Sequence, residues 1–385
     1  MSQPVPSSLQ SARTAAMQPS LIRAVYDRRR PSSLNLGLGQ PSLPVPDAIL
    51  DEGQRRLRLG SMGYTANAGL TGLREAIARH HDLEGRRDAA SVVVTCGAQE
   101  AILAVMMATL DPGDEVVVPD PGFPSYAAVA TLLGARAVAV PRDPARGFRL
   151  IARDVEQAVT AHTRLLVLNS PGNPTGSVDD DDELRSLAAL VDRRDIAVLS
   201  DEIYADLCYL PHAVPSIARH TRRVFLVSGL SKSCAMTGFR LGYVVGDPIH
   251  MTGVLRAHHM AATCAPTLSQ HMAQFVFENP QWLTHHHPIY TERRAAALKA
   301  LHGLGCPVLQ PDGAFYVMID LSSYTEDSLQ LALDLLDQED VITAPGAAFG
   351  HVTRSWLRLT FADEPRVFED AVTRIGRFLQ GRGRR

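Results

Sequence analysis

Residues 164–176 read RLLVLNSPGNPTG, and this stretch contains the pattern that decides the fold. An apolar run without alternation, RLLVLN, passes directly into the turn-forming segment SPGNPTG. A continuous apolar run is typical of a strand buried on both faces, as in a parallel sheet covered by helices. Proline, glycine and asparagine after it indicate a tight turn. The stretch therefore predicts a buried strand with polar residues at its carboxyl end.

The same pattern recurs from about residue 90 to residue 245. Six further short apolar runs lie at 91–95, 115–119, 135–140, 196–200, 223–228 and 241–246. Helix-length segments such as AQEAILAVMMATL (98–110) and DDDDELRSLAALVDRR (179–194) separate several of them. Strands that alternate with helices predict an α/β domain, in which helices flank both faces of a mostly parallel sheet.

The ends of the chain have a different character. Residues 281–385 contain strand-like GAFYVMIDL and WLRLTFA among helical stretches, which predicts a smaller α+β domain. We expect residues 46–280 to form the large domain, and residues 1–45 to supply an N-terminal arm and a segment of the small domain. The first 30 residues, rich in Ser, Pro and Gln and then basic, predict a surface arm or a partner-contacting segment.

Composition excludes several classes of partner. The chain has 385 residues, of which 45% are hydrophobic, so it can bury a large core. Its 38 basic and 41 acidic residues leave a formal net charge of -3, which provides no broad field for nucleic acid or anionic lipid. The longest largely apolar run, 101–110, is about half of what a membrane span needs, and no signal-peptide pattern is apparent. Five scattered cysteines without a CxxC indicate reduced thiols. We expect a cytoplasmic protein without membrane or nucleic-acid partners.

Lysine is nearly absent, which limits the candidates for amine chemistry to two. Only Lys232 and Lys299 occur among the 38 basic residues. Lys299 lies near the end of a predicted helix, where a cation complements the helix dipole, so a structural role is preferred. Lys232 follows an apolar strand-like run and is surrounded by small residues, a poor setting for a merely solvated lysine.

Polar residues at the ends of the predicted strands form one coherent set. In open parallel sheets, ligands collect outside the carboxyl ends of the strands. The residues that follow the runs are Gly97, Ala98 and Gln99, then Asn169 and Asn173, then Asp201 and Tyr204, then Ser231 and Lys232, with Arg240 eight residues further on. Together they supply an amine, a carboxylate, a phenol, an amide and a helix start suited to an anion.

This combination matches the needs of pyridoxal 5′-phosphate (PLP). The cofactor requires a lysine to form an aldimine, an acid to keep its pyridine nitrogen protonated, donors to its ring hydroxyl and a cradle for its phosphate. Each part alone is weak evidence, since SGLSKS lacks the spacing of a P-loop and NPTG alone is a turn. Because each part follows a separate predicted strand, the set predicts one PLP site.

From about residue 34 to residue 376 the chain resembles the class I/II aminotransferases of the fold type I PLP enzymes. The ordered motifs that carry the resemblance are LGLGQPSLPVP, YTANAGLTGLREAIA, TCGAQEAI, PGFPSY, NSPGNPTG, SDEIY, SKSCAMTGFRLGY, GAFYV, APGAAFG and WLRLTFA. The resemblance implies amino acid and 2-oxo acid substrates, and a homodimer whose active sites are shared across the interface.

The resemblance also implies a role for each site residue. Lys232 would hold the cofactor as an internal aldimine and, once freed by substrate, shuttle the proton between Cα and C4′. Asp201 would pair with the pyridinium nitrogen. Tyr204 and Asn173 would hydrogen-bond the ring oxygen, and Phe123 would stack on the pyridine ring.

The remaining implied roles concern the phosphate and the substrate. The phosphate-binding set would be Gly97, Ala98, Gln99, Ser231 and Arg240, with Tyr64 from the other subunit of the dimer. Arg358 would grip the substrate α-carboxylate as a bidentate fork, near Asn173, and Gly39 would close over that carboxylate. One alternative for Arg358 stays open, an ordinary surface ion pair. We interpret Tyr126 as a packing residue rather than a catalytic one.

Transamination by a ping-pong mechanism is the expected reaction. The nearest alternative is a PLP-dependent C–S β-lyase or another eliminating enzyme of the same fold. Gly172 stands where similar lyases often carry histidine, which favours the transferase. A PLP-sensing regulator is disfavoured by the negative net charge and by the roughly 34 residues before the matching region, too few for a winged helix.

The sequence also gives expectations for the side chain of the substrate and for metal binding. No second arginine can be placed against a dicarboxylate side chain, which favours a neutral, apolar or aromatic substrate. Gln40 and the segment GHVTRSW depart from the family pattern and can reshape the entrance to the substrate site.

We expect no metal, because His285–His287 lack ligand geometry on a helix and precede Pro288. We interpret these histidines as a solvated helix boundary.

Overall fold

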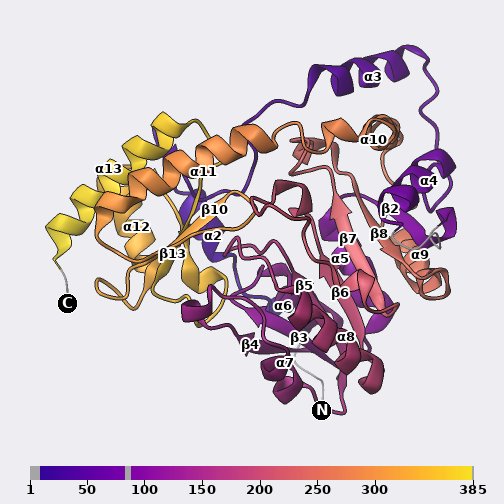
Figure 1. Cartoon of the computed structure of the whole chain (residues 1–385), viewed down its shortest axis with the longest axis horizontal. Helices are drawn as coiled ribbons and strands as arrows, with labels where there is room; N and C mark the ends of the chain where they lie inside the picture. Colours follow the sequence, from indigo (N-terminus) through magenta and orange to yellow (C-terminus); the bar gives the residue numbers. More distant parts are fainter. Residues whose placement is uncertain (1–8, 83–87, 384–385) are drawn as a thin grey trace.

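A seven-stranded sheet forms the centre of the computed structural model, which describes residues 9–82 and 88–383 (Figure 1). The strands, in the order of the sheet, are β2 (Val92–Thr95), β8 (Gly242–Gly246), β7 (Val224–Gly229), β6 (Ala197–Asp201), β5 (Thr163–Asn169), β3 (Glu115–Asp120) and β4 (Arg136–Pro141). Only β8 runs antiparallel to its neighbours. The mostly parallel sheet expected from the sequence is confirmed.

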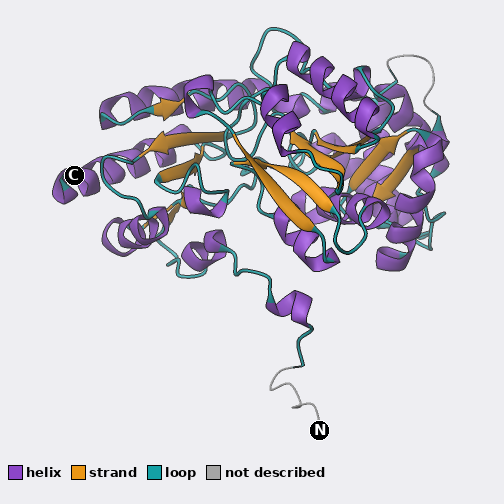
Figure 2. Cartoon of the chain, turned by 90° about the horizontal axis from the view of Figure 1, so that it is seen from below, coloured by secondary structure: helices purple, strands orange, loops and turns teal. Residues whose placement is uncertain are grey.

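Helices cover both faces of this sheet, as the view in Figure 2 shows. The covering helices are α5 (Ala98–Thr109), α6 (Ser125–Leu133) and α9 (Pro248–Ala262) on one face, and α4 (Thr71–His80), α7 (Ala152–Ala158), α8 (Asp181–Arg194) and α10 (Thr267–Glu278) on the other, with α3 (Asp47–Arg58) packed on α10. In β5, Leu165 and Val167 face the first group, whereas Leu166 and Leu168 face the second. Since both faces of the strands are buried, the runs are continuously apolar.

The C-terminal third forms a separate group of elements beside the large sheet (Figure 1). Its strands and helices are α11 (His287–Leu301), β9 (Val308–Leu309), β10 (Tyr316–Asp320), α12 (Ser328–Glu339), β11 (Val341–Ile342), β12 (Ala344–Pro345), β13 (Trp356–Thr360) and α13 (Pro365–Arg382). Strands β12, β13, β10 and β9 make an antiparallel sheet. The N-terminal strand β1 (Leu34–Asn35) pairs with β11, so the small α+β unit joins both ends of the chain.

The N-terminal segment is more closely integrated than a surface arm. Helix α1 (Ala12–Ala15) is exposed, but α2 (Leu21–Tyr26) buries Val25 completely in the core of the small unit. The expectation of a surface arm is therefore wrong for α2, because the apolar residues of LIRAVY pack inward. The part of that expectation that concerns residues 1–8 lies outside the described residues.

Between residues 9–82 and 88–383, no helix is both long and apolar enough to cross a membrane.

Candidate active site

The predicted site residues meet at the carboxyl ends of the parallel strands, around a cavity of about 280 Å³. Those that line it are Gly39, Ala98, Gln99, Phe123, Asn173, Asp201, Tyr204, Ser231, Lys232, Arg240 and Arg358. Two predicted residues do not line it. Gly97 lies directly behind Arg240, and Tyr64 is 89% exposed and away from the cavity of its own chain.

Lys232 projects from the loop after β7 into this cavity. Its Nζ donates a hydrogen bond of 2.7 Å to the backbone oxygen of Gly39. Burial, and next the positive charge of Arg358, lower the pKa of Lys232 to about 8, although Asp201 acts in the opposite direction. The neutral, nucleophilic form of this amine is therefore more abundant near neutral pH than in an ordinary lysine. Lys299, the other lysine, is exposed on α11.

Asp201, the last residue of β6, is a buried carboxylate at the floor of the cavity. Burial raises the pKa of Asp201 to about 6, and the hydrogen bond from Tyr126 opposes this rise. The Tyr126 hydroxyl donates to Oδ2 of Asp201 at 2.7 Å. Tyr126 is thus more than a packing residue. A buried tyrosine hydroxyl normally needs a partner, but the sequence does not show which one.

A pair of tyrosines borders the opposite side of the cavity. The hydroxyl groups of Tyr204 and Tyr316 lie 2.7 Å apart, and both residues are buried. Tyr316 begins β10 and was given no role by the sequence analysis, although it lies in the GAFYV motif. A Cβ atom at position 39 would overlap its hydroxyl oxygen, so only glycine fits there.

We interpret the start of α5 as a candidate anion cradle. The N–H groups of Ala98 and Gln99 lie in the first helical turn and so have no intrahelical acceptor. Gly97 precedes them with φ at 91°, and a Cβ atom there would lie 2.5 Å from Nη2 of Arg240. A glycine therefore lets the guanidinium approach the helix start. Ser231 adds a hydroxyl on the same side of the cavity, so the cradle combines backbone donors, a hydroxyl and a cation.

Arg358, in the middle of β13, is a buried cation that is only partly paired. It is 3% exposed, and its guanidinium carbon lies 4.2 Å from the ring centre of Tyr316 and 4.8 Å from that of Phe349. Nη1 donates to Oδ1 of Asn173 at 2.8 Å, and Nη2 donates to the backbone oxygen of Gly37. Its Nε has no partner in the described residues. A buried, unpaired N–H on a cation indicates a place for an anion, and the alternative of a surface ion pair is wrong.

The other lining residues received no role from the sequence motifs. These are Ile22, Leu38, Ile102, Asn169, Ile203, Thr237 and Tyr316. Asn169 was noted as a strand-end residue but given no role. Its Oδ1 accepts a 2.7 Å hydrogen bond from the backbone N–H of Asn173, which fixes the turn below Arg358. The apolar members carry no pattern that distinguishes a cavity wall from an ordinary core position.

The interpretation of the histidine run as a solvated boundary is wrong for two of its three members. His286 is buried, and its Nδ1 lies 3.1 Å from the backbone oxygen of Ser233. His287 is half-buried, and its Nε2 lies 2.6 Å from the backbone oxygen of Cys208. Both rings are drawn inward because α11 starts against the loops that follow β6 and β7. As far as the chain is described, no group of three or more His, Cys, Asp or Glu side chains is arranged to hold a metal ion.

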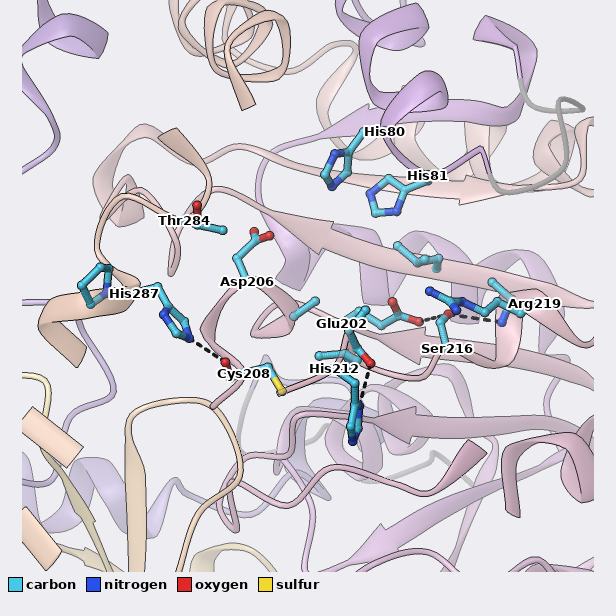
Figure 3. Close-up of a pocket in the computed structure, with 16 residues that line it drawn as sticks. His80, His81, Glu202, Asp206, Cys208, His212, Ser216, Arg219, Thr284 and His287 are labelled. Atoms are coloured by element: carbon cyan, nitrogen blue, oxygen red, sulfur yellow. Dashed lines mark hydrogen bonds between the residues drawn. The ribbon is translucent and has the colours of Figure 1, made fainter. Parts of the chain in front are cut away.

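A second cavity, of about 510 Å³, lies on the other side of the loop after β6 (Figure 3). Its labelled side chains come from separate elements and are spread around the space, with Glu202 beside Ser216. Glu202 accepts hydrogen bonds from the hydroxyl groups of Ser200 and Ser216, at 2.8 and 2.6 Å. None of the predicted site residues lines this larger cavity.

Comparison with known proteins identifies the family of the chain. The family model for aminotransferase class I and II matches residues 31–375. A putative aminotransferase of Bacillus subtilis, YugH, is 34% identical over 94% of this chain and 96% of its own length. A probable aspartate aminotransferase of Methanocaldococcus jannaschii is 31% identical over 94% of this chain and 97% of its own length.

Solved structures of similar proteins extend the agreement to the whole fold. A mutant of Thermus thermophilus aspartate aminotransferase has a TM-score of 0.91 and 32% identity, with 96% of this chain and 99% of that chain covered. An aromatic aminotransferase of Pyrococcus horikoshii has a TM-score of 0.87 and 32% identity, with 94% and 99% covered. These relatives are transferases, so the lyase alternative is not favoured. The chain belongs to the class I and II aminotransferases and is a PLP-dependent transaminase.

Proposed function

We propose that the cavity of about 280 Å³ is the active site, where an amino group passes from an L-amino acid to PLP and then to a 2-oxo acid. One observation carries the proposal. The amine of Lys232, the carboxylate of Asp201 and the partly unpaired guanidinium of Arg358 face one cavity, although they come from three separate elements. Such convergence of titratable groups is typical of a catalytic site.

The residues present fit PLP. The start of α5, Ser231 and Arg240 offer donors and positive charge for a phosphate. The buried carboxylate of Asp201, whose pKa is raised by burial, is suited to a cationic partner such as a protonated pyridine nitrogen. When bound, PLP supplies an electrophilic carbon and a ring that withdraws electrons from the substrate. Phe123 offers an aromatic face for stacking on that ring.

Lys232 has two tasks in this proposal. Its amine would hold the cofactor and, once released by the substrate, would take the proton from the substrate Cα and pass that proton to the cofactor. A pKa of about 8 supports this exchange, because a base works best when its pKa lies near the working pH. The backbone oxygen of Gly39 orients the amine through their 2.7 Å hydrogen bond.

The other residues bind and orient. Arg358 holds the α-carboxylate, with its free Nε as one donor, and Gly39 closes over that group. Asn173, which already accepts from Arg358, and Tyr204 would donate to the ring oxygen of the cofactor. The clamp fixes the substrate at its carboxylate, so the Cα–H bond is held at a constant place relative to Lys232.

The proposal also covers the oligomeric state of the enzyme and its location in the cell. We place the enzyme in the cytoplasm as a homodimer, in which Tyr64 of the partner subunit completes the phosphate site. The exposed ring of Tyr64, outside the cavity of its own chain, supports this arrangement. The cysteines form no disulfide, which suits a reducing compartment. The domain boundaries after residues 45 and 280 stay a prediction.

A half-reaction tests the proposed function. The purified protein, loaded with PLP, is mixed with a panel of amino acids without any 2-oxo acid, and the cofactor absorbance and the products are followed. A transaminase converts its cofactor once and releases one 2-oxo acid per site, and adding a 2-oxo acid restores the first spectrum. Continuous release of pyruvate and ammonia from a cysteine-type substrate would instead identify a lyase.

A further inference from the structure

The proposed active site contains a wall that the transfer reaction itself does not use. We define the side-chain wall as Ile22, from α2, and Leu38, from the loop after β1, both of which line the cavity. Both side chains are aliphatic. An aliphatic surface in a cavity that also contains charged groups needs an apolar occupant if it is to stay dry.

The position of Leu38 links the wall to the substrate. The backbone oxygen of Gly37 accepts from Arg358, and that of Gly39 accepts from Lys232. Leu38 therefore lies between the residue proposed to hold the α-carboxylate and the residue proposed to act at Cα. The substrate side chain starts at that same Cα, so it must leave the reacting centre close to this segment.

Ile22 is held in place by the rest of α2. Val25, one turn further on, is completely buried in the core of the small unit. Just after the helix, Arg28 donates to Asp337 of α12 at 3.0 Å. The Ser20 hydroxyl caps the first turn by accepting from the N–H of Arg23 at 3.3 Å. These contacts hold α2 in place, so Ile22 has a fixed position beside the cavity.

The cationic side chains around the cavity limit the kind of substrate side chain that can bind beside the wall. Among the described residues that line the cavity, the cationic side chains are those of Lys232, Arg240 and Arg358. The proposed function assigns each of them to the cofactor or to the α-carboxylate. The described residues of this chain therefore leave no cation for a second carboxylate, and burying an uncompensated carboxylate against aliphatic side chains is strongly unfavourable.

We infer that this enzyme selects amino acids with a neutral, apolar or aromatic side chain, and that Ile22 and Leu38 determine this specificity. The inference rests on the proposed function, because it takes the roles of Lys232 and Arg358 from it. It also separates this chain from relatives named as aspartate aminotransferases, whose substrate has a second carboxylate. Such a substrate would need a cation from the partner subunit.

The first test measures kcat/KM of the PLP-loaded enzyme for phenylalanine, leucine, aspartate and glutamate with one common 2-oxo acid. We expect the two apolar donors to exceed the two acidic donors by at least about 100-fold. Binding of non-reacting analogues gives a second readout: 3-phenylpropanoate should bind more tightly than succinate. A preference for aspartate and succinate would overturn the inference.

Variants at Ile22 test the wall itself. Ile22→Ala should lower kcat/KM for phenylalanine and leucine by about 10- to 100-fold and change the value for alanine little, because alanine does not reach the wall. Ile22→Arg should raise kcat/KM for aspartate relative to phenylalanine. The matched control is Leu57→Ala on α3, which removes a 54% exposed side chain outside the cavity. Equal losses for alanine and phenylalanine in Ile22→Ala would contradict the assignment.

The two proposals fail in different ways. If no amino acid of the panel changes the cofactor absorbance, the proposed function is wrong and the inference falls with it. If the cofactor is converted but aspartate is the best donor, only the inference is wrong.

Discussion

Two cavities lie on either side of the loop after β6, and the smaller one is the proposed active site. Ile203 and Tyr204 face the cavity of about 280 Å³, whereas Glu202 and Asp206 face that of about 510 Å³. Burial raises the pKa of Asp206 to about 6, as it does that of Asp201 in the smaller cavity. Neither volume nor a raised pKa therefore distinguishes a catalytic site.

The difference lies in whether the polar groups converge. In the larger cavity Glu202 is already satisfied by two serine hydroxyls, and His287 is bound to a backbone oxygen. In the smaller cavity Arg358 keeps an unpaired Nε, and Lys232 faces the open space. The proposed site is thus marked by groups from separate elements that keep donor atoms available beside one cavity.

Removal of the amine should have the largest effect. Lys232→Ala should lower kcat for transamination by at least about 10³-fold, because it removes both the attachment of the cofactor and the base. Assays of activity, together with absorbance of the bound cofactor, measure this. Lys299→Ala, in the exposed lysine of α11, is the control and should retain both properties. A result in which Lys299→Ala is inactive and Lys232→Ala is active would contradict the site.

Loss of the buried arginine should come second. Arg358→Ala should lower kcat/KM by about 10²- to 10³-fold, since truncating one partner of a buried charge pair is costly. Arg358→Lys should recover only part of the loss, because an ammonium cannot reproduce the planar fork. Affinity for PLP should change little in both variants. An equally large loss of PLP affinity would show that Arg358 supports the fold rather than the substrate.

The pH dependence of cofactor attachment should report the environment of Lys232. Since its pKa is lowered to about 8, the neutral fraction of the amine rises with pH, is about one half at pH 8 and becomes nearly constant only above about pH 9. The rate at which PLP attaches to the cofactor-free protein should follow the same curve. Arg358→Gln removes a positive charge that lowers this pKa, so its curve should move to higher pH. An unchanged curve would show that the charge of Arg358 does not lower the pKa of Lys232, contrary to this prediction.

The tyrosine pair should contribute a smaller, tuning effect. Tyr316→Phe keeps the ring beside Arg358 and removes the hydroxyl that lies 2.7 Å from that of Tyr204. The loss of one hydrogen bond, about 1 kcal/mol, predicts a decrease in kcat of about 2- to 10-fold. The pH at which the bound cofactor changes absorbance should shift as well. If the activity falls but this pH stays constant, Tyr316 does not act through Tyr204.

A change in the larger cavity should have the smallest effect. His212 is exposed, and its Nδ1 lies 3.1 Å from the backbone oxygen of the next residue. His212→Ala should leave kcat and kcat/KM within about two-fold of the original values, in steady-state assays with any amino donor. A loss above about 10-fold would mean that the larger cavity takes part in the reaction.

Much of the fold could be predicted because the sheet is buried on both faces. Each of the seven apolar runs begins within one residue of the observed strand, since no polar face interrupts the pattern. Because the carboxyl ends of parallel strands meet at one edge of the sheet, the sequence also predicted that Asp201 and Lys232 lie at one site, although 31 positions separate them in the chain. Local sequence was sufficient for these residues because the topology of the sheet decides where strand ends meet.

The remaining features depend on contacts between distant segments. Tyr126 reaches Asp201 from a helix on one face of the sheet, and Ile22 enters the cavity from an N-terminal helix. His286 turns inward because of the loop that contains Ser233. None of these positions has a local pattern that differs from ordinary packing or solvation, so only the three-dimensional arrangement assigns them.

The central claim is that one amine, on the loop after β7, holds the cofactor. Reduction of the PLP-loaded protein with borohydride fixes the cofactor to its lysine, and mass spectrometry of a proteolytic digest then locates the labelled residue. We predict a single labelled peptide that contains Lys232. A label on Lys299, or loaded protein that carries no label after reduction, would contradict this account.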